Sequence, residues 1–398
     1  MEDLIVPGLL SSLLACAVAG YGIRESRRHE RLLRRIPVRV HVNGTRGKSS
    51  VTRLIAGGLR AGGWRVLAKT TGTTARMILP DGSEVDVYRF GHPNIIEQTR
   101  IVRRAVEEEA QALVIECMAV APDLQPLSEL RLIRSGVGAI TNVRADHLDV
   151  MGPTLDDVAM ALAQTAPRDG HLFTAERDRA HLLEQVARGR GSETHLVPAS
   201  NAGSADLAGF SYIEHSDNVA LALAVCAHLG MDRATALRGM QAATPDPGVL
   251  RRYTVRSGDK QVTFINAFAA NDPDSTLLIW DRLGLNTRRD RERRIVLLTC
   301  RADRLHRSHQ LVALAAGRLG PVHLVLAGEG TAAVAMRAVT LGIPREHVSD
   351  LGRLGAERVY ERVLDLAGER AVVVGVGNIV GLGAEIALHF SNRAVSRG

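Results

Sequence analysis

Aromatic residues and cysteine are scarce in this chain. Phe, Trp and Tyr together make up 3% of the 398 residues, so a hydrophobic core has to rest on Leu, Val, Ala and Ile. The four cysteines are far apart and form no Cys-x-x-Cys pair. That spacing argues against a zinc site or a disulfide framework and favours a reducing compartment. The sequence also lacks internal repeats and long low-complexity tracts.

A concentrated basic patch is missing from most of the chain. The formal net charge is +7, and the densest cluster is residues 24–35, with six Arg and two Glu. The remaining excess is spread thinly over residues 36–398. Nucleic-acid binding would need a concentrated patch, so we expect no nucleic-acid partner. The arginines within residues 288–294 are interpreted as a solvated face, with contact to a polyanionic product as the alternative.

One long uncharged run stands near the start. Leu4 to Ile23 contains twenty residues without charge, and a helix of that length rises roughly 30 Å, about one bilayer core. Arginines follow the run, whereas a signal peptide would carry its positive charges before it. The pattern predicts a single-pass transmembrane helix in the cell membrane, with the catalytic body in the cytoplasm. A buried helix of a globular domain is the alternative.

Strands and helices alternate along the rest of the chain. Apolar runs predict strands at 39–43, 112–115, 137–142 and 171–174, and helices at 97–109, 155–166 and 218–229. Alternation of this kind is typical of an α/β domain with a largely parallel sheet.

The strongest turn signal is Pro245-Asp246-Pro247-Gly248. Beyond it, strands are predicted at 262–266, 295–300, 322–327 and 371–376. We therefore expect an α/β protein in three parts: a transmembrane anchor with a basic segment (1–36), a P-loop domain (37–248) and a Rossmann-like α/β domain (249–398).

A glycine turn follows the first predicted strand and precedes a helical pattern. Glycines let backbone N–H groups surround phosphate oxygens, and a helix N-terminus favours negative charge. Lys48 would reach the β- and γ-phosphates of ATP, and Ser49 would ligate Mg²⁺. Val42 stands where the usual first P-loop glycine would be, so the match is to a shorter form; a chance glycine turn is the alternative. The predicted ATP-binding residues of the turn are Gly44, Thr45, Arg46, Gly47, Lys48, Ser49 and Ser50.

This shorter form, Gly-Thr-x-Gly-Lys-Ser, resembles that of the Mur ligase superfamily. Glu116 at a strand end agrees with that resemblance, and residues 141–149 are similar to the superfamily signature Thr-Asn-x-x-x-Asp-His-Leu-Asp. The resemblance implies that Lys48, Glu116 and His147 are catalytic. It also implies Mg²⁺, with Mn²⁺ as the alternative, held by Ser49, Glu116 and His147. Supporting roles would fall to Asp146 and Asp149, and ATP contacts to Asn218 and Arg301.

Four further segments resemble the ligase subunit of bacterial capsule-type poly-γ-glutamate synthases: residues 69–74, 94–98, 300–304 and 375–381. The resemblance implies an ATP-dependent amide ligase that polymerises glutamate through an acyl phosphate. Its partners would be glutamate, the growing polymer, the membrane and small membrane subunits, and a homo-oligomer is left open. The substrate candidates are Thr73, Asn94, Asp303, Arg304 and Arg307. Ion pairs with a structural role are the alternative for the charged residues.

Departures from the superfamily pattern leave alternatives open. Leu162 stands where many Mur ligases have a carbamylated lysine, which implies a second metal held more weakly or in another way. Leu221 replaces the second asparagine of the adenine-binding segment that begins near Asn218. A folylpolyglutamate synthase-like ligase and a P-loop NTPase subunit that powers polymer export remain as alternative functions, together with an inactive scaffold. The glycines at 375–381 form a broken dinucleotide fingerprint and favour a tight turn over a dehydrogenase.

Overall fold

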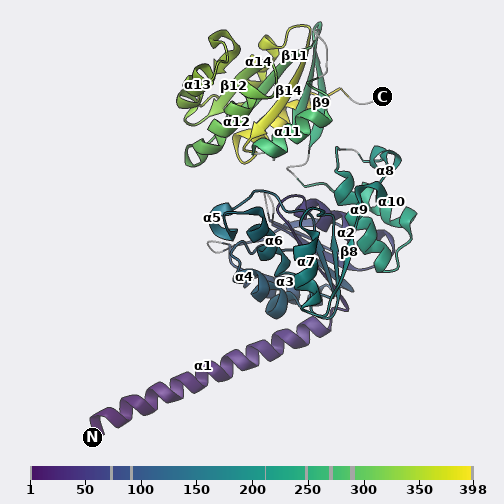
Figure 1. Ribbon diagram of the computed structural model, residues 1–398, viewed down its shortest axis with the longest axis vertical. Helices are drawn as coiled ribbons and strands as arrows, with labels where there is room; N and C mark the ends of the chain where they lie inside the picture. The colour runs from purple at the N-terminus through teal and green to yellow at the C-terminus, as the bar shows by residue number, and fades with distance from the viewer. Residues whose placement is uncertain are drawn as a thin grey trace. The chain divides into compact units, whose positions relative to one another are not determined.

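The computed structural model describes residues 2–71, 75–89, 93–210, 212–246, 250–268, 272–286 and 292–395, with side chains from Leu14 onward. The chain divides into two compact units, one of residues 1–211 and 215–245 and one of residues 212–214 and 246–398. Each unit is built on one sheet (Figure 1). The predicted domain limits at residues 36 and 248 stay predictions, and Pro247 and Gly248 lie outside the described residues.

The first unit has an eight-stranded sheet in the order β4-β3-β2-β5-β1-β6-β7-β8. The strands β2, β5, β1, β6, β7 and β8 run parallel to one another. Next to β2, the strand β3 is antiparallel to β2, and β4 is antiparallel to β3. The strands are β1 (Val38–Asn43), β2 (Val66–Thr70), β3 (Arg76–Ile78), β4 (Glu84–Asp86), β5 (Ala112–Glu116), β6 (Val137–Ile140), β7 (His171–Thr174) and β8 (Glu193–Leu196).

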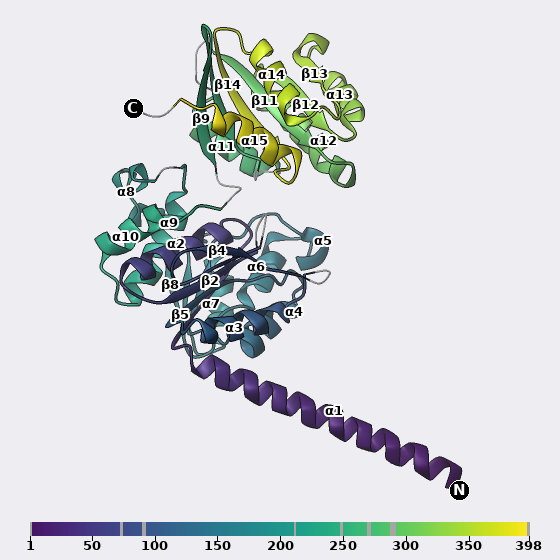
Figure 2. The same ribbon diagram turned by 180° about the vertical axis from the view of Figure 1, so that it is seen from behind.

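Helices cover both faces of this sheet (Figure 2). On one face, α2 (Lys48–Ala61) packs against α9 (Ser216–His228) and α10 (Arg233–Ala242). The helices α2 and α10 approach closely, since a side-chain carbon at Gly57 would lie 2.6 Å from the Gly239 carbonyl oxygen. On the other face, α3 (Glu97–Glu107), α6 (Leu155–Ala163) and α7 (Ala180–Arg188) bury apolar clusters against the strands. The shorter helices are α4 (Leu124–Leu127), the π-helix η1 (Ser128–Ile133), α5 (Leu148–Met151), the 3₁₀-helix η2 (Ala199–Asn201) and α8 (Ser204–Ala208).

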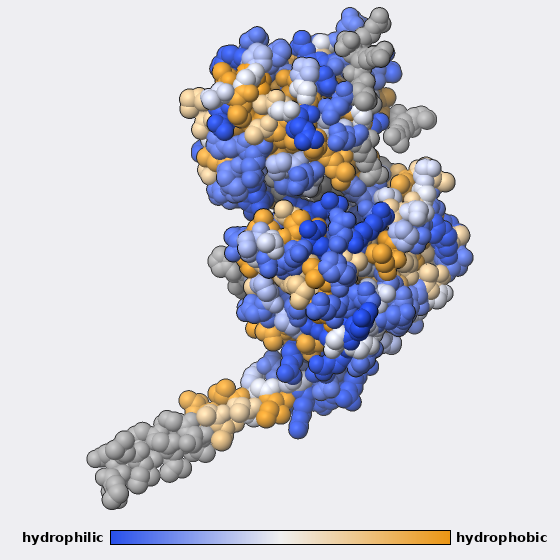
Figure 3. Space-filling view, in the orientation of Figure 1, coloured by the Kyte–Doolittle hydropathy of each residue, from blue (hydrophilic) through white to orange (hydrophobic). Residues whose placement is uncertain are grey.

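Helix α1 (Glu2–Arg34) covers the predicted membrane span. Its side chains are described from Leu14, and ten uncharged residues, Leu14 to Ile23, precede Arg24. Exposed apolar side chains gather along this stretch and give way to hydrophilic ones toward the body (Figure 3). No helix in the described part of the chain is long and apolar enough to cross a membrane. The predicted transmembrane helix and single-pass membrane location are therefore wrong, which corrects the fold class to an α/β protein with two sheets.

The second unit has a six-stranded sheet in the order β13-β12-β11-β14-β10-β9, in which β9 is antiparallel to β10 and the other pairs are parallel. The strands are β9 (Arg251–Ser257), β10 (Lys260–Asn266), β11 (Arg293–Cys300), β12 (His323–Gly328), β13 (Val348–Asp350) and β14 (Arg370–Gly377). Two apolar clusters fill the two faces. One cluster includes the buried Trp280 and packs under α11 (Pro273–Arg282), α12 (Leu305–Gly317) and α13 (Thr331–Thr340). The other packs under α14 (Ala356–Leu366) and α15 (Leu382–Asn392). Two 3₁₀-helices are η3 (Ala302–Arg304) and η4 (Arg345–His347).

Candidate active site

The carboxyl ends of β1, β5 and β6 meet at one edge of the first sheet. Val42 of β1 is in register with Glu116 of β5, and Asn43 with Ile140 of β6. Because parallel strands end at the same edge, the loop after β1 lies between Glu116 and the segment that follows β6. Ligands of open α/β sheets bind at this edge, outside the carboxyl ends of the strands.

The loop after β1 requires glycine at two positions. Gly44 and Gly47 have φ angles of 128° and 83°, which only glycine adopts readily. A side-chain carbon at position 44 would lie 2.0 Å from Thr141 Oγ1, and one at position 47 would lie 2.6 Å from Asn218 Oδ1. Helix α2 begins directly after Gly47, so its first backbone N–H groups face the turn and can bind an anion. Asn218, the adenine candidate, lies buried against this turn in the first turn of α9.

Asn142 and Thr141 fix the loop in place. Asn142 Oδ1 accepts hydrogen bonds from Thr45 Oγ1 (2.8 Å) and the Arg46 backbone N–H (3.1 Å). Asn142 Nδ2 and Thr141 Oγ1 both donate to the Arg46 carbonyl oxygen, at 3.0 and 2.6 Å. The backbone of the turn is therefore held by side chains of the neighbouring strand connection, and it needs little rearrangement to surround a phosphate.

Ser49 and Glu116, two of the predicted metal ligands, are in direct contact. Ser49 Oγ donates to Glu116 Oε2 at 2.7 Å, and the backbone N–H of Thr71 donates to the same oxygen at 2.7 Å. Glu116 is 2% exposed, whereas Ser49 is half-buried at the start of α2. Lys48 Nζ donates to the carbonyl oxygens of Gly44 and Thr45, at 2.7 and 3.3 Å. The lysine thus lies over the turn, where a bound phosphate would attract it.

His147 lies farther out on the loop after β6. It has a φ angle of 48° and precedes α5, and its side chain is exposed. His147 Nε2 lies 3.9 Å from Asp146 Oδ1, and Arg46 Nη2 lies 3.8 Å from the same carboxylate oxygen. Asp149 is exposed in α5. The loop therefore connects back to the P-loop through Asp146, and the roles predicted for His147 and Asp149 stay predictions.

A buried ion pair beside Glu116 was missed from the sequence. Lys69 Nζ, at the end of β2, lies 2.8 Å from Glu97 Oε1, and both side chains are buried. Arg89 Nε donates to the other oxygen of Glu97 at 2.6 Å. Burial acts to raise the pKa of Glu97, but the hydrogen bonds from Arg89 and Lys69 outweigh it and hold that pKa below its ordinary value. Burial lowers the pKa of Lys69 despite Glu97 and the nearby Glu116. The sequence signal was a lysine in an otherwise apolar strand, which usually requires a buried partner.

Other predicted positions have simpler surroundings. Asn94 is exposed, and its Oδ1 accepts from the Ile96 backbone N–H at 3.0 Å in the turn before α3. Leu162 is 1% exposed in the apolar cluster under α6, so the position of the superfamily's modified lysine is part of the core here. Thr73 lies outside the described residues, as do residues 287–291, which include part of the arginine run at 288–294.

In the second unit, the arginine segment follows β11 at the carboxyl edge of its sheet. Arg301 Nε and Nη2 donate to the two carboxylate oxygens of Asp303, at 2.9 and 2.8 Å. Arg304 Nε lies 3.8 Å from Asp303 Oδ2. The same edge includes the turn after β14, where Thr299 Oγ1 donates to the Asn378 carbonyl oxygen at 2.7 Å. Arg301, Arg304, Arg307 and Asn378 line a shallow hollow there, so the predicted residues do cluster, but a substrate role stays a prediction.

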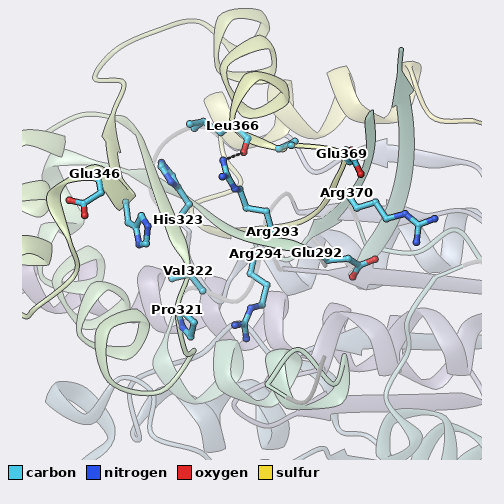
Figure 4. A pocket seen from close by; sticks show the side chains of 13 residues that line it. Glu292, Arg293, Arg294, Pro321, Val322, His323, Glu346, Leu366, Glu369 and Arg370 are labelled. Carbon is cyan, nitrogen blue, oxygen red and sulfur yellow. Dashed lines mark hydrogen bonds between the residues drawn. The ribbon is translucent and has the colours of Figure 1, made fainter. Parts of the chain in front are cut away.

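A larger cavity of about 650 Å³ lies at the opposite end of the second sheet (Figure 4). Arg293, His323 and Arg370, at or near the amino ends of β11, β12 and β14, contribute to its wall. Arg293 Nη1 donates to the Leu366 carbonyl oxygen at 2.6 Å across it (Figure 4). Because α/β enzymes bind substrates at the carboxyl edge, this cavity is not part of the candidate active site.

The P-loop at the carboxyl edge of the first sheet, together with the two α/β units, defines a Mur-type ATP-dependent ligase. Two family models match the chain and support this class. A model of the Mur ligase middle domain matches residues 42–240. A model described as the poly-gamma-glutamate synthase CapB C-terminal domain matches residues 252–393. The chain belongs to the CapB family of poly-γ-glutamate synthases, and the resemblance found in the motifs is confirmed.

Two curated relatives have the same organisation along most of their length. The chain is 40% identical over 366 residues to the capsule biosynthesis protein CapB of Bacillus anthracis, which covers 91% of this chain and 78% of that protein. It is 39% identical over 375 residues to the PGA synthase CapB of Bacillus subtilis (strain 168), covering 93% and 94%.

Solved structures of folylpolyglutamate synthases share the fold. The Mycobacterium tuberculosis enzyme complexed with ADP superposes with a TM-score of 0.69 at 16% identity, covering 92% of this chain and 94% of that one. The bifunctional folylpolyglutamate synthase/dihydrofolate synthase from Yersinia pestis, complexed with AMPPNP and Mn, gives 0.66 at 17% identity, covering 92% of each chain. At such identities the likeness concerns the fold.

Proposed function

We propose that this chain is an ATP-dependent amide ligase that joins glutamate units into poly-γ-glutamate. Membership of the CapB family supports the glutamate substrate. The structural observation that carries the proposal is the contact between Ser49 Oγ and the buried Glu116 carboxylate, at 2.7 Å beneath the P-loop. A serine and a carboxylate at the start of a phosphate-binding helix are the groups needed where ATP and a metal ion meet.

Mg²⁺ is the proposed ion, with Mn²⁺ as an alternative. Ser49 and Glu116 offer two oxygen donors within 2.7 Å of each other, and hard divalent cations prefer oxygen ligands. The donor pair therefore fits the ion, and His147 is proposed as a further ligand from the neighbouring loop. A bound Mg²⁺ would neutralise charge on the β- and γ-phosphates.

The reaction would proceed in two steps. A carboxylate of the growing chain attacks the γ-phosphorus of ATP, which forms an acyl phosphate and releases ADP. The amine of an incoming glutamate then attacks the acyl carbon, and the amide forms as phosphate leaves with loss of a proton. Lys48 would turn from its contacts with Gly44 and Thr45 to the transferring phosphoryl group, whose charge it stabilises. The turn fixed by Asn142 would hold the phosphates in line for attack.

ADP release and product formation from ATP and glutamate test the proposal. The wild-type chain should release ADP in a glutamate-dependent manner, and acid hydrolysis of the product should return glutamate. Lys48→Ala should abolish turnover while circular dichroism stays unchanged, because the substitution removes the charge nearest the transferred phosphate. Normal ATP consumption by the folded variant would reject the assignment.

The alternative functions predict different outcomes in the same assay. A folylpolyglutamate synthase-like ligase would require a folate acceptor before it released ADP. An export NTPase would release ADP without forming an amide, and an inactive scaffold would release none. The CapB relatives favour the glutamate polymer over all three.

Partner subunits are part of the proposal. The CapB family likeness supports small membrane subunits that act with the ligase in polymerisation. Polymer length should therefore rise when such subunits are co-expressed with this chain. Full-length polymer made by the purified chain alone would contradict this expectation, and sedimentation of the same sample would report whether the chain forms a homo-oligomer.

A further inference from the structure

Histidines gather at the outer end of the first sheet, away from the P-loop. His171 is the first residue of β7, whereas the P-loop follows the last residue of β1. Because these strands are parallel, the two features lie at opposite edges of the sheet. Strand β8, which supplies Glu193 and His195, is the edge strand next to β7. The cluster is therefore separate from the candidate active site.

The strand register places the cluster on one face. His171 is paired with Glu193, and Phe173 with His195, so all four side chains point to the same side of the sheet. Helix α9 covers this side and ends with His228, whose ring centroid lies 4.2 Å from that of His171. The ring of Phe173 stacks on His195 with centroids 4.5 Å apart and planes at 18°. These contacts restrict the imidazole orientations.

The distances between the polar atoms match those of a metal site. His171 Nδ1 lies 3.1 Å from His195 Nε2. Glu193 Oε2 lies 3.6 Å from His171 Nδ1 and 3.8 Å from His195 Nε2. Zn²⁺ binds imidazole and carboxylate ligands at roughly 2.0–2.1 Å, which places tetrahedral ligands about 3.3 Å apart. The three groups therefore need to move only by tenths of an ångström to share one ion.

We propose that His171, Glu193 and His195 form a Zn²⁺ site, with water as the fourth ligand. Two imidazoles and one carboxylate are a donor set that zinc uses and that Mg²⁺, which prefers oxygen, does not. The few, widely spaced cysteines in the sequence argued against a zinc site, but that argument applies only to sites with thiolate ligands. Bound zinc would cross-link the edge strand β8 to β7, so its effect is on stability and not on the ligase reaction.

Zinc titration of the full-length protein tests the site. A chelating dye would compete for Zn²⁺ in the presence of millimolar Mg²⁺, which occupies the oxygen sites near Glu116. The wild-type chain should bind one tight Zn²⁺, and zinc should raise its unfolding temperature. His195→Gln should weaken Zn²⁺ binding at least about 100-fold. Removal of a residue that only hydrogen-bonds a metal ligand lowers metal affinity by up to about this factor, and removal of a ligand itself should lower it at least as much.

Two further variants make the test decisive. Glu193→Gln removes a ligand whose side chain is 67% exposed, so it keeps the test valid if His195→Gln fails to fold. His181→Gln, which alters an exposed histidine of α7, is the matched control and should bind zinc like the wild type. X-ray absorption should show only N and O ligands at about 2.0 Å. The proposal is overturned if the wild type binds no tight zinc, if both ligand variants keep the wild-type affinity, or if the control loses it equally.

Discussion

The two units differ in how their carboxyl sheet edges are built. In the first unit the edge is held internally: Asn142 and Thr141 hydrogen-bond the P-loop, and Glu116 is buried with two donors on one oxygen. In the second unit the corresponding edge has an exposed arginine segment, in which Arg301 pairs with its near neighbour Asp303. A pre-formed site suits phosphates of fixed geometry, whereas an exposed cluster keeps its side chains free to rearrange.

This difference implies that substitutions should have different effects on activity and stability at the two edges. At the first edge, the side chains of Thr141, Asn142 and Glu116 hydrogen-bond neighbouring segments, so their loss should affect both activity and stability. At the second edge, solvent screens the charges, so stability should hardly change and only substrate contacts would matter.

Replacement of Glu116 should have the largest effect. Glu116→Ala removes the buried carboxylate that accepts from Ser49 and Thr71, and we expect glutamate-dependent ADP release to fall at least about 1000-fold. The control is Glu107→Ala, at an exposed position of α3, which should keep wild-type activity. Full activity in Glu116→Ala would mean that the catalytic centre lies elsewhere.

The ion pair beside Glu116 should give the next largest effect, on stability. Glu97→Gln leaves Lys69 buried without its carboxylate, and we expect a loss of about 3 kcal/mol or more. The pKa of Glu97 is held below its ordinary 4.5, so the ionised pair stabilises the fold above that pH and the benefit is lost as pH falls through the lowered pKa. Chemical denaturation from pH 7 to pH 3 should show the two proteins converging in acid; a constant difference would contradict the assigned pair.

Loosening the P-loop should have an intermediate effect. Asn142→Ala deletes three hydrogen bonds to Thr45 and Arg46, which should cost about 1–3 kcal/mol in stability. We also expect the KM for ATP to rise about tenfold, because the free turn must now be ordered by the ligand. Asn201→Ala, at an exposed position, provides the control. An unchanged KM would show that the turn is rigid without Asn142.

A smaller effect is expected at His147, which is exposed and lies at the outer loop. His147→Ala should lower ADP release about tenfold, and excess divalent metal should restore part of it, because a lost ligand weakens metal binding without removing Ser49 and Glu116. The measurement is rate against Mg²⁺ and Mn²⁺ concentration. If the metal dependence of the variant equals that of the wild type, His147 is not a ligand.

The smallest stability effect should come from Arg301. Arg301→Ala breaks an exposed ion pair and should change the free energy of unfolding by no more than about 0.5 kcal/mol. If Arg301 contacts ATP or substrate, the KM of that ligand should rise in Arg301→Ala and stay closer to normal in Asp303→Ala. Equal behaviour of the two variants would assign the pair to local structure alone.

Much of the fold was predictable because apolar runs in parallel sheets are continuous. The strand predicted at 171–174 is β7 as observed, and the runs at 262–266 and 371–376 lie within β10 and β14. Short, half-exposed strands such as β4 and β8 were not predicted, because they lack an apolar pattern of their own. Residues 199–209 are rich in small and polar residues, which is typical of a loop, yet they contain η2 and α8; Asp206 accepts from the Gly203 backbone N–H at the start of the short helix α8. The predicted membrane span is wrong, although both the apolar run and the arginines that follow it favoured it.

At the candidate active site, the sequence predicted residues that belong to contiguous motifs. It did not predict contacts between residues that only the fold brings together. Ser49 and Glu116 were predicted together by the superfamily resemblance, and strand register explains why they meet. The partnership of Lys69 with Glu97 depends on the packing of α3 beside β2, which no local pattern encodes. The roles assigned to His147, Asn218 and the arginines of the second unit remain predictions.

Because aromatic residues are scarce, tryptophan fluorescence can be assigned to individual positions in this chain. The chain has two tryptophans, and they fall one in each unit: Trp64 is half-buried before β2, and Trp280 is buried in the apolar cluster under α11. Trp64→Phe would leave an emission that reports on the second unit alone, and Trp280→Phe would report on the first. Fluorescence melts of the pair would therefore show whether the two units unfold as one cooperative transition or as two.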